Sequence, residues 1–354
     1  MFWVTVSSRG LPPNWKSRSQ ERAVWTGAVG GLAPVHSCFS RRFYSRRFSA
    51  QTFFSRSLTT SECCVMNKFS HVSFLSDYGT QDEFVGVVKA VIADIAPHVN
   101  VIDLVHDVTP FDVRAGSLAL ARCVPYVPTG VVLAVVDPGV GGSRRAIAIS
   151  VGGGKGVFIG PDNGLLPGAV ALAGGPDRAV VLNNPAYQLA SPGDTFAGRD
   201  IFAPAAAHLC NGVALTDLGD EIDPSLLLPG VVPLPREEGG QLLSEVTWVD
   251  RFGNCQLNVG PEDIEKWGSP LRIIIGASDP THQIVRSVPV VRNFADIGGG
   301  IGLVVDSYGM LALCVDRGSA AAELQLGPTD MVVIAQDPSA GAGVATSVRL
   351  SAKK

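Results

Sequence analysis

Short apolar runs alternate with helix-like stretches between about residues 70 and 230. The runs are rich in β-branched residues, which is typical of buried strands. The predicted strands lie at 71–76, 99–104, 131–136, 146–151, 156–159 and 179–182. Apolar residues at helical spacing predict helices at 83–94, 113–124 and 200–209. Strands that alternate with helices predict an α/β domain with a mostly parallel sheet.

The pattern changes after about residue 230, where residues 227–240 are rich in Pro and Gly and are typical of a linker. Short alternating segments separated by turn residues follow at 244–248, 272–275, 284–288, 302–305, 311–315, 323–326 and 331–335. This spacing predicts a smaller all-β domain, a barrel or a sandwich. The predicted domains are therefore an α/β domain at 70–232 and a barrel-like domain at 241–354, with a site between them.

Residues 1–66 have a different composition from either domain. They contain nine Lys or Arg and two acidic residues, together with many serines. This composition indicates a disordered leader that acts as an organelle transit peptide, with a chloroplast favoured over a mitochondrion. A disordered basic arm for RNA or membrane is the alternative. Secretion is disfavoured because no apolar stretch of about 7–15 residues follows the N-terminal charge.

The charge distribution and the cysteine content limit which binding partners and which cellular compartment fit this protein. The leader carries a net +7 of a chain whose total is −4, so the remaining residues carry −11. An acidic body argues against nucleic-acid binding, which needs a basic surface. The seven cysteines form no CxxC pair, which fits a reducing compartment. No apolar run reaches the roughly 18 residues of a membrane span.

Acidic residues stand where predicted strands end. Asp77, Asp137 and Asp162 each follow such a strand, and Arg144 follows the glycine-rich turn after Asp137. Ligands of open α/β sheets bind outside the carboxyl ends of the strands. These side chains therefore predict one site for a polar, partly cationic ligand.

Several roles remain open for these residues on their chemistry alone. The Asp77 carboxylate can accept two ribose hydroxyls, hold a metal or cap the next helix. Asp82, near the start of that helix, is a candidate cap. Arg144 beside Asp137 can fix a water and favour its hydroxide form, or the pair can be purely structural. A metal phosphohydrolase is the interpretation that these residues favour by themselves.

Six motifs, taken in chain order, add a family resemblance. They are Ser76–Gly79, Asp137–Gly141 with Arg144 and Arg145, Pro161–Gly164, Thr195–Asp200, Asp250–Asn254 and Gly318–Ala321. Together they make the chain resemble the S-adenosyl-L-methionine (SAM) hydroxide adenosyltransferases, relatives of the fluorinase and chlorinase enzymes. The resemblance implies an α/β domain followed by a β-barrel, and a homotrimer with its sites at the subunit interfaces. It also implies hydrolysis of SAM to adenosine and L-methionine, with no metal and no cofactor, because SAM is the substrate.

The resemblance assigns roles to single residues. Asp137 and Arg144 match two members of a catalytic Asp-Arg-His triad that positions the attacking water. The residues that the resemblance implies for substrate binding are Asp77 (ribose), Asp82 (methionine amino group), Asp250 and Ser307 (amino-acid end), Phe252 and Asn254 (adenine), and Phe196.

The family motif has a histidine where this chain has Ala197. Alanine cannot hydrogen-bond to water, so two alternatives to hydrolysis follow. One is a SAM- or adenosine-binding protein with weakened catalysis. The other is a SAM-dependent halogenase that forms 5′-halo-5′-deoxyadenosine, which Asp137 disfavours because a carboxylate repels a halide.

Overall fold

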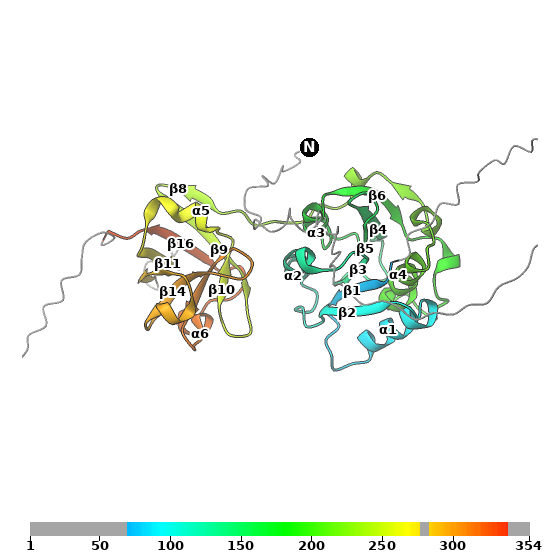
Figure 1. Ribbon diagram of the computed structural model, residues 1–354, viewed down its shortest axis with the longest axis horizontal. Coiled ribbons are helices and arrows are strands. Elements are labelled where there is room, and N and C mark those ends of the chain that lie inside the picture. Colours follow the sequence, from blue (N-terminus) through cyan, green and yellow to red (C-terminus); the bar gives the residue numbers. More distant parts are fainter. Residues whose placement is uncertain (1–68, 277–282, 339–354) are drawn as a thin grey trace, which may run out of the picture. The chain divides into compact units, whose positions relative to one another are not determined.

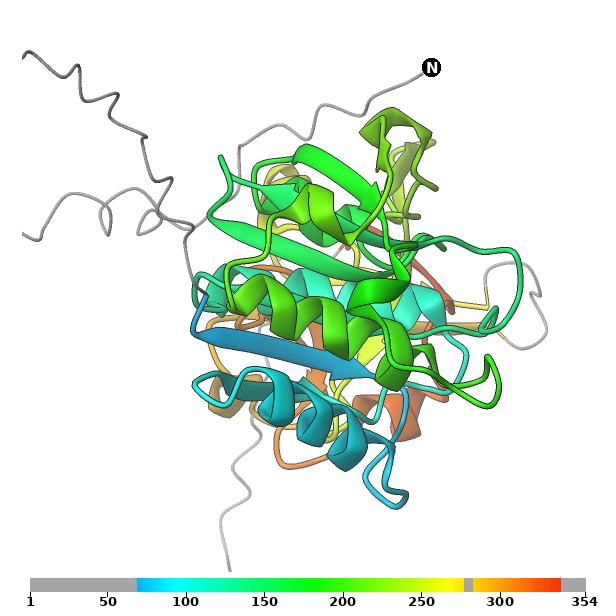
Figure 2. The same cartoon turned by 90° about the vertical axis from the view of Figure 1, so that its right-hand side faces the viewer.

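The computed structural model describes residues 69–276 and 283–338, and the leader predicted at 1–66 lies outside these residues. In the described part, strands form two separate sheets, one of seven strands and one of nine. The seven-stranded sheet belongs to an N-terminal α/β domain with helices packed on it, as Figures 1 and 2 show. The nine-stranded sheet forms the C-terminal domain.

The first sheet has the strand order β2-β1-β3-β5-β4-β6-β7. Its strands are β1 (His71–Ser76), β2 (Asn100–Val105), β3 (Val131–Val135), β4 (Ala146–Val151), β5 (Gly156–Pro161), β6 (Pro176–Val181) and β7 (Glu221–Ile222). The neighbours β2, β1, β3 and β5 are parallel, whereas β4 is antiparallel to both β5 and β6. Five strands therefore run in one direction, and the prediction of a mostly parallel sheet is confirmed.

The antiparallel part begins at a tight hairpin between β4 and β5. The connection contains Gly152, Gly153 and Gly154, whose φ angles are 62°, 71° and 81°. Residues with a side chain rarely adopt such values, so the glycines allow the chain to reverse without a helix. The sequence places no helical stretch between these two strands, which is consistent with a hairpin.

Helices cover both faces of the first sheet. They are α1 (Phe84–Ile95), α2 (Val113–Cys123), α3 (Pro167–Leu172) and α4 (Ala203–Cys210), and a π-helical turn at Gly198–Phe202 leads into α4. α1 packs with α4, and α2 packs with α3. Along β3, alternate residues belong to two different apolar cores, one beneath each helix pair. Both faces of a strand are buried in this way only when helices cover both sides of the sheet.

The second sheet has the order β12-β11-β16-β9-β10-β15-β14-β13, and β8 pairs with β9. Its strands are β8 (Arg236–Glu238), β9 (Gln241–Val249), β10 (Cys255–Leu257), β11 (Leu271–Ile275), β12 (Ile284–Val288), β13 (Val290–Val291), β14 (Ile301–Val305), β15 (Leu311–Val315) and β16 (Met331–Gln336). All of its pairs are antiparallel except β13 with β14. The sheet curls into a nearly closed barrel around one apolar core, as predicted.

One predicted strand of this domain, at 323–326, is wrong. Its first two residues belong instead to helix α6 (Ala320–Leu324), and its last two follow the end of that helix. The Ser319 side chain accepts a hydrogen bond from the backbone N–H of Ala322, and alanines with high helix propensity follow the cap. Gln325 then adopts a φ of 55° and ends the helix. A short helix, α5 (Pro261–Ile264), was not predicted either.

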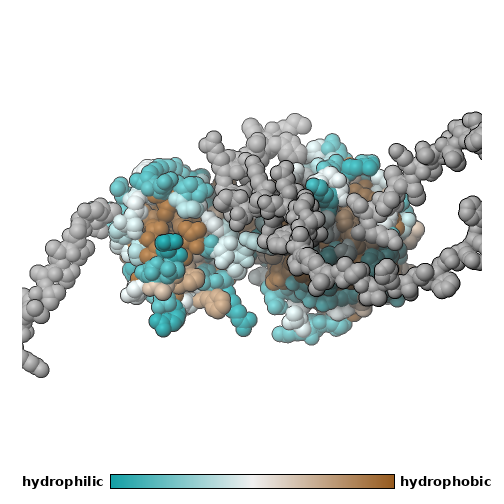
Figure 3. Space-filling model, in the orientation of Figure 1, coloured by the Kyte–Doolittle hydropathy of each residue, from teal (hydrophilic) through white to brown (hydrophobic). Residues whose placement is uncertain are grey.

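Figure 3 shows apolar residues gathered on one face of the C-terminal domain, with hydrophilic residues around them. Large apolar side chains of this domain that are exposed include Phe252, Phe294 and Tyr308. No helix in the described part of the chain is long and apolar enough to cross a membrane.

Candidate functional site

Asp77 lies directly after β1, where its backbone N–H donates to the carbonyl of Val135 over 3.3 Å. The backbone N–H of Phe111 donates to the Asp77 carboxylate over 2.9 Å. Phe111 has a φ of 69°, which is strained for an aromatic residue, and this conformation keeps its N–H directed at the carboxylate. Burial raises the pKa of Asp77, the backbone hydrogen bonds oppose this rise, and the nearby charge of Asp137 adds to it.

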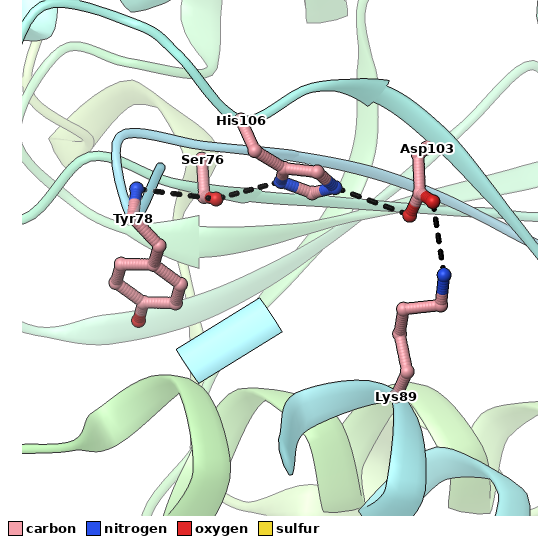
Figure 4. Close-up of polar contacts among 5 residues, drawn as sticks. All are labelled: Ser76, Tyr78, Lys89, Asp103 and His106. Atoms are coloured by element: carbon pink, nitrogen blue, oxygen red, sulfur yellow. Dashed lines mark hydrogen bonds and ion pairs between the residues drawn. The ribbon is translucent and has the colours of Figure 1, made fainter. Parts of the chain in front are cut away.

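A chain of four polar side chains supports the residues next to Asp77 (Figure 4). Ser76 Oγ lies 2.8 Å from His106 Nδ1, His106 Nε2 lies 3.1 Å from Asp103, and Lys89 Nζ lies 2.9 Å from the same carboxylate. The backbone N–H of Tyr78 donates to Ser76 Oγ over 3.4 Å. Burial raises the pKa of Asp103, but the hydrogen bonds from Lys89 and His106 outweigh burial and lower it.

The order of these groups resembles a Ser-His-Asp triad, but their burial excludes a nucleophilic serine. Ser76 is 0% exposed and His106 is 6% exposed, so a substrate cannot reach the hydroxyl. With Nε2 donating to Asp103, His106 accepts at Nδ1 from the serine hydroxyl. The chain therefore holds the ends of β1 and β2 together beneath the turn that carries Asp77.

Asp137 and Arg144 form a bidentate ion pair after β3. Arg144 Nε lies 3.0 and 2.9 Å from the two carboxylate oxygens, and Nη2 lies 2.6 Å from Oδ2. The side chains are 5% exposed for Asp137 and 14% exposed for Arg144. The guanidinium also lies 5.6 Å from the centre of the buried Phe202 ring. The pair is thus fixed in position and largely shielded from solvent.

Asp162 has a different role from Asp137, although both follow strands of the same sheet. Its carboxylate accepts from Arg145 Nε over 2.8 Å and from the backbone N–H of Leu228 over 2.9 Å. Arg145 also donates to the carbonyl of Leu226. Asp162 therefore anchors the segment around 226–228, and the structure does not add it to a three-carboxylate site.

An aromatic cluster adjoins the two acidic residues. The rings of Tyr78, Phe84 and Phe196 contact one another with centroid separations of 5.1 to 5.8 Å. Ala197 follows Phe196, is buried, and precedes the π-helical turn. Within that turn, Arg199 pairs with the buried carboxylate of Asp200. Asp200 is therefore an ion-pair partner inside the turn.

Asp82 lies in a more exposed environment than Asp77, which is partly buried. Asp82 is exposed at the turn before α1, whose N-cap residue is Glu83. The capping role considered for Asp82 is therefore wrong, because the N-cap position belongs to Glu83, whose side chain makes no capping hydrogen bond.

The C-terminal domain contributes a pocket of about 340 Å³ whose lining includes Asp250, Asn254 and Ser307. The Asp250 carboxylate accepts from the backbone N–H groups of Phe252 and Asn254 and from the Asn254 amide. It therefore shapes the β9–β10 loop and holds Asn254 at the pocket wall. Phe252 is 76% exposed at the tip of that loop.

A second loop of the same design lines the pocket between β14 and β15. Asp306 accepts from the backbone N–H groups of Tyr308 and Met310, as Asp250 does in its own loop. Both loops read Asp-x-aromatic-Gly, with glycine φ angles of 82° at Gly253 and 83° at Gly309. Aspartate often accepts from the backbone two residues ahead in such turns. The repeated pattern is visible in the sequence, although our sequence analysis did not use it.

Within residues 69–276 and 283–338, no group of three or more His, Cys, Asp or Glu side chains is arranged to hold a metal ion. The described cysteines are free, and Cys210, Cys255 and Cys314 are buried. Burial raises the pKa of the Cys210 thiol to about 12. The candidate site of the N-terminal domain therefore consists of the Asp77 and Asp137 carboxylates and the Arg144 guanidinium, next to the aromatic cluster.

Family models for the two domains of SAM hydroxide adenosyltransferases match this chain. The N-terminal domain model matches residues 72–219, and the C-terminal domain model matches residues 244–333. The chain belongs to the SAM hydroxide adenosyltransferase family. The identification made from the six motifs is therefore confirmed.

Individual relatives support this assignment. The chain is 45% identical to an (R)-S-adenosyl-L-methionine hydrolase of Salinispora tropica, over 73% of this chain and 95% of that protein. It is 30% identical to a fluorinase of Actinoplanes, over 68% of this chain and 89% of that protein. A crystal structure of an uncharacterized conserved protein from Thermotoga maritima aligns with a TM-score of 0.67 and 33% identity, covering 75% of this chain and 99% of that one.

The site residues that the family resemblance implies fall into two groups in the structure, one in each domain. Asp77, Asp137 and Arg144 interact electrostatically with one another or with Tyr78 in the N-terminal domain, where Phe196 contacts the Tyr78 ring. Asp250, Asn254 and Ser307 line one pocket of the C-terminal domain. The sequence analysis quoted Tyr78 only as part of the Ser76–Gly79 motif and gave it no role. It did not name Asp306, which stands in the turn sequence Asp-Ser-Tyr-Gly.

Proposed function

We propose that this protein hydrolyses SAM to adenosine and L-methionine, and that its substrate is the (R) epimer at the sulfonium sulfur. The observation that carries the proposal is the fixed Asp137–Arg144 pair at the carboxyl end of β3. The hydrolase relative, 45% identical, is named for this substrate epimer. Family membership further supports adenosyl transfer to a hydroxide.

The site chemistry suits attack by water on a sulfonium. Water bound at the Asp137–Arg144 pair attacks ribose C5′ in line with sulfur, forming the C5′–O bond. The C5′–S bond breaks, and its electron pair neutralises the sulfonium as methionine leaves. The Asp137 carboxylate accepts the proton that the water loses. Charge that is neutralised in a site with little solvent, together with alignment of the reacting atoms, supplies the rate enhancement.

The other assigned residues bind the two ends of the substrate. Asp77 accepts the ribose hydroxyls, and Asp82 binds the methionine amino group. Asn254 and Phe252 hold the adenine, with Ser307 and Asp250 at the amino-acid end and Phe196 against the substrate. The Asp250 carboxylate already accepts three hydrogen bonds within its loop. Its contribution is therefore mainly to shape the pocket.

The assembly and location proposed for the enzyme follow the same resemblance. We propose a homotrimer in which the N-terminal domain of one subunit and the C-terminal domain of its neighbour complete each site. Import into an organelle, a chloroplast in preference to a mitochondrion, is proposed from the composition of residues 1–66. Light scattering measures the trimer mass, and a fluorescent fusion of the full chain locates the protein.

Product analysis of the purified full chain tests the function. Incubation with a mixture of both sulfonium epimers is expected to release adenosine and methionine and to consume the (R) epimer selectively. Turnover is expected to continue with chelator and without added halide. SAM binding without product would support the binding-protein alternative, for which the buried Ala197 is the motivating observation. A 5′-halo product in chloride or bromide would support the halogenase alternative.

A further inference from the structure

Ala197 presents only a methyl group to its surroundings, and it lies at the start of a π-helical turn that adjoins the ion pair. Arg144 packs on Phe202 in this turn. The loop after Asp137 also closely approaches the residues that precede this turn, since a Cβ added to Gly141 would lie 3.1 Å from the carbonyl of Asp194. The Ala197 side chain cannot hydrogen-bond to a water at the ion pair.

The hydroxyl of Tyr78 lies against the residue that follows Ala197. A Cβ added to Gly198 would collide with the Tyr78 hydroxyl oxygen and lie 3.1 and 3.2 Å from two ring carbons. Residues 198 and 202 are about one turn apart on the same π-helical segment. Tyr78 and Arg144 therefore pack against the two ends of one five-residue segment.

The position of Tyr78 is fixed from two sides. Its ring makes edge or tilted contacts with Phe74, Phe84 and Phe196, at 6.4, 5.7 and 5.8 Å between centroids. Its backbone N–H is hydrogen-bonded to Ser76, and in Figure 4 the ring extends away from the His106 chain. A phenol held in this way keeps its hydroxyl in one place at little cost in conformational entropy.

The charges that act on the Tyr78 phenol include those of the proposed site residues Asp77, Asp137 and Arg144. Burial raises the pKa of Tyr78, the charges of Asp77 and Asp137 raise it further, and Arg144 opposes them. The phenol therefore stays protonated and neutral. Among residues 69–276 and 283–338, no side chain or backbone group forms a hydrogen bond with its hydroxyl. Its donor and acceptor sites are free for a water.

We infer that the Tyr78 hydroxyl is the third group that positions the attacking water, together with Asp137 and Arg144. The inference rests on the proposed function and takes it one residue further. The water donates one hydrogen to Asp137 and the other to the Tyr78 oxygen, which leaves a lone pair directed at C5′. As the C5′–O bond forms and the C5′–S pair passes to sulfur, the proton goes to Asp137, and Tyr78 keeps its own.

Tyr78→Phe in the full chain tests the inference, because it removes one oxygen and keeps the packed ring. We expect kcat for adenosine release to fall by about tenfold or more, the size typical of losing a positioning group. The Kd for SAM and the melting temperature are expected to remain near those of the wild type. Tyr126→Phe is the matched control, since Tyr126 is exposed and lies outside the site.

Different failures of this experiment have different meanings. Wild-type protein that releases no adenosine overturns the proposed function itself. Active wild type with an unchanged kcat in Y78F, or with only a weaker Kd for SAM, overturns the role of Tyr78 and leaves the function standing. If Y78F fails to fold, Gly198→Ala displaces the hydroxyl without removing it, and a kcat equal to the wild type in that variant overturns the role equally.

Discussion

Ser76 Oγ and His106 Nδ1 are joined by a hydrogen bond of 2.8 Å that connects the carboxyl ends of β1 and β2. The backbone repeats the connection, since the Gly79 N–H donates to the His106 carbonyl over 2.7 Å. Both bonds lie beneath the turn that carries Asp77 and Tyr78. The relationship explains how a loop can present two site residues in a fixed position.

Ser76→Ala is expected to destabilise the protein and weaken substrate binding. The change leaves His106 Nδ1 and the Tyr78 N–H without their buried partner, at a cost of roughly 1–3 kcal/mol. A less constrained turn positions Asp77 less well, so KM for SAM is expected to rise more than kcat falls. Thermal unfolding and steady-state kinetics measure both effects. Ser73→Ala is the control, because Ser73 is buried on the same strand. Equal losses of stability and of substrate binding in the two variants would refute the role of the hydrogen bond between Ser76 and His106.

The sequence predicted the sheet and the positions of its carboxylates because these depend on local patterns. Buried strands are apolar, and Asp77 and Asp137 each lie within two residues of a strand end, so topology alone brings them to one edge. The strand predicted at 323–326 failed because a short apolar run is ambiguous, and the Ser319 cap decided for a helix.

Partner choice could not be predicted in the same way. Asp137 and Asp162 have similar sequence surroundings, and Arg144 and Arg145 are adjacent, yet each arginine pairs with a different carboxylate. The pairing depends on where β3, β5 and the segment around 226–228 meet in space. The location of the Tyr78 hydroxyl depends likewise on the packing of Gly198, to which no sequence pattern points.

The two arginines allow a matched test of the ion pair. Arg144→Ala and Arg145→Ala each remove the partner of a buried carboxylate, and breaking such a pair costs about 3–5 kcal/mol. Both variants are therefore expected to unfold at lower temperature. Only Arg144→Ala is expected to lose turnover, by about 10²–10⁴-fold, because Arg145 anchors the segment around 226–228. Adenosine release, measured below the melting temperatures of both variants, shows whether Arg144 is needed for turnover. Similar activity in the two variants would remove Arg144 from the mechanism.

The raised pKa of Asp77 predicts a pH-dependent penalty on stability. A carboxyl whose pKa is higher in the folded protein than its ordinary value of 3.8 binds protons more tightly when folded. Folding stability therefore falls as pH rises from below 3.8 through the raised pKa, and the full penalty is present above it. Asp77→Asn removes the charge and retains an acceptor for the Phe111 N–H.

Asp77→Asn is accordingly expected to be more stable than the wild type at pH 7 and nearly equal to it near pH 3.5. The same variant is expected to bind SAM more weakly at pH 7, because an amide accepts ribose hydroxyls less strongly than a carboxylate. Melting temperatures at several pH values test the first part, and calorimetry tests the second. A stability difference that grows as the pH is lowered would contradict the assigned direction of the pKa shift.

The close approach of Tyr78 to Gly198 predicts a strongly non-additive pair of substitutions. In Gly198→Ala the new methyl group meets the Tyr78 hydroxyl, and overpacking of this kind costs about 1–3 kcal/mol. Tyr78→Phe removes the oxygen that is struck and leaves only the contacts with ring carbons at 3.1 and 3.2 Å. The double variant is therefore expected to be more stable than Gly198→Ala alone, which a double-mutant cycle of thermal unfolding measures.

Gly86→Ala is the control, because Gly86 lies in α1 with no atom within 4 Å of an added Cβ, and alanine there should stabilise the helix by up to about 1 kcal/mol. Additive effects at Tyr78 and Gly198 would mean that the hydroxyl does not occupy this position in solution.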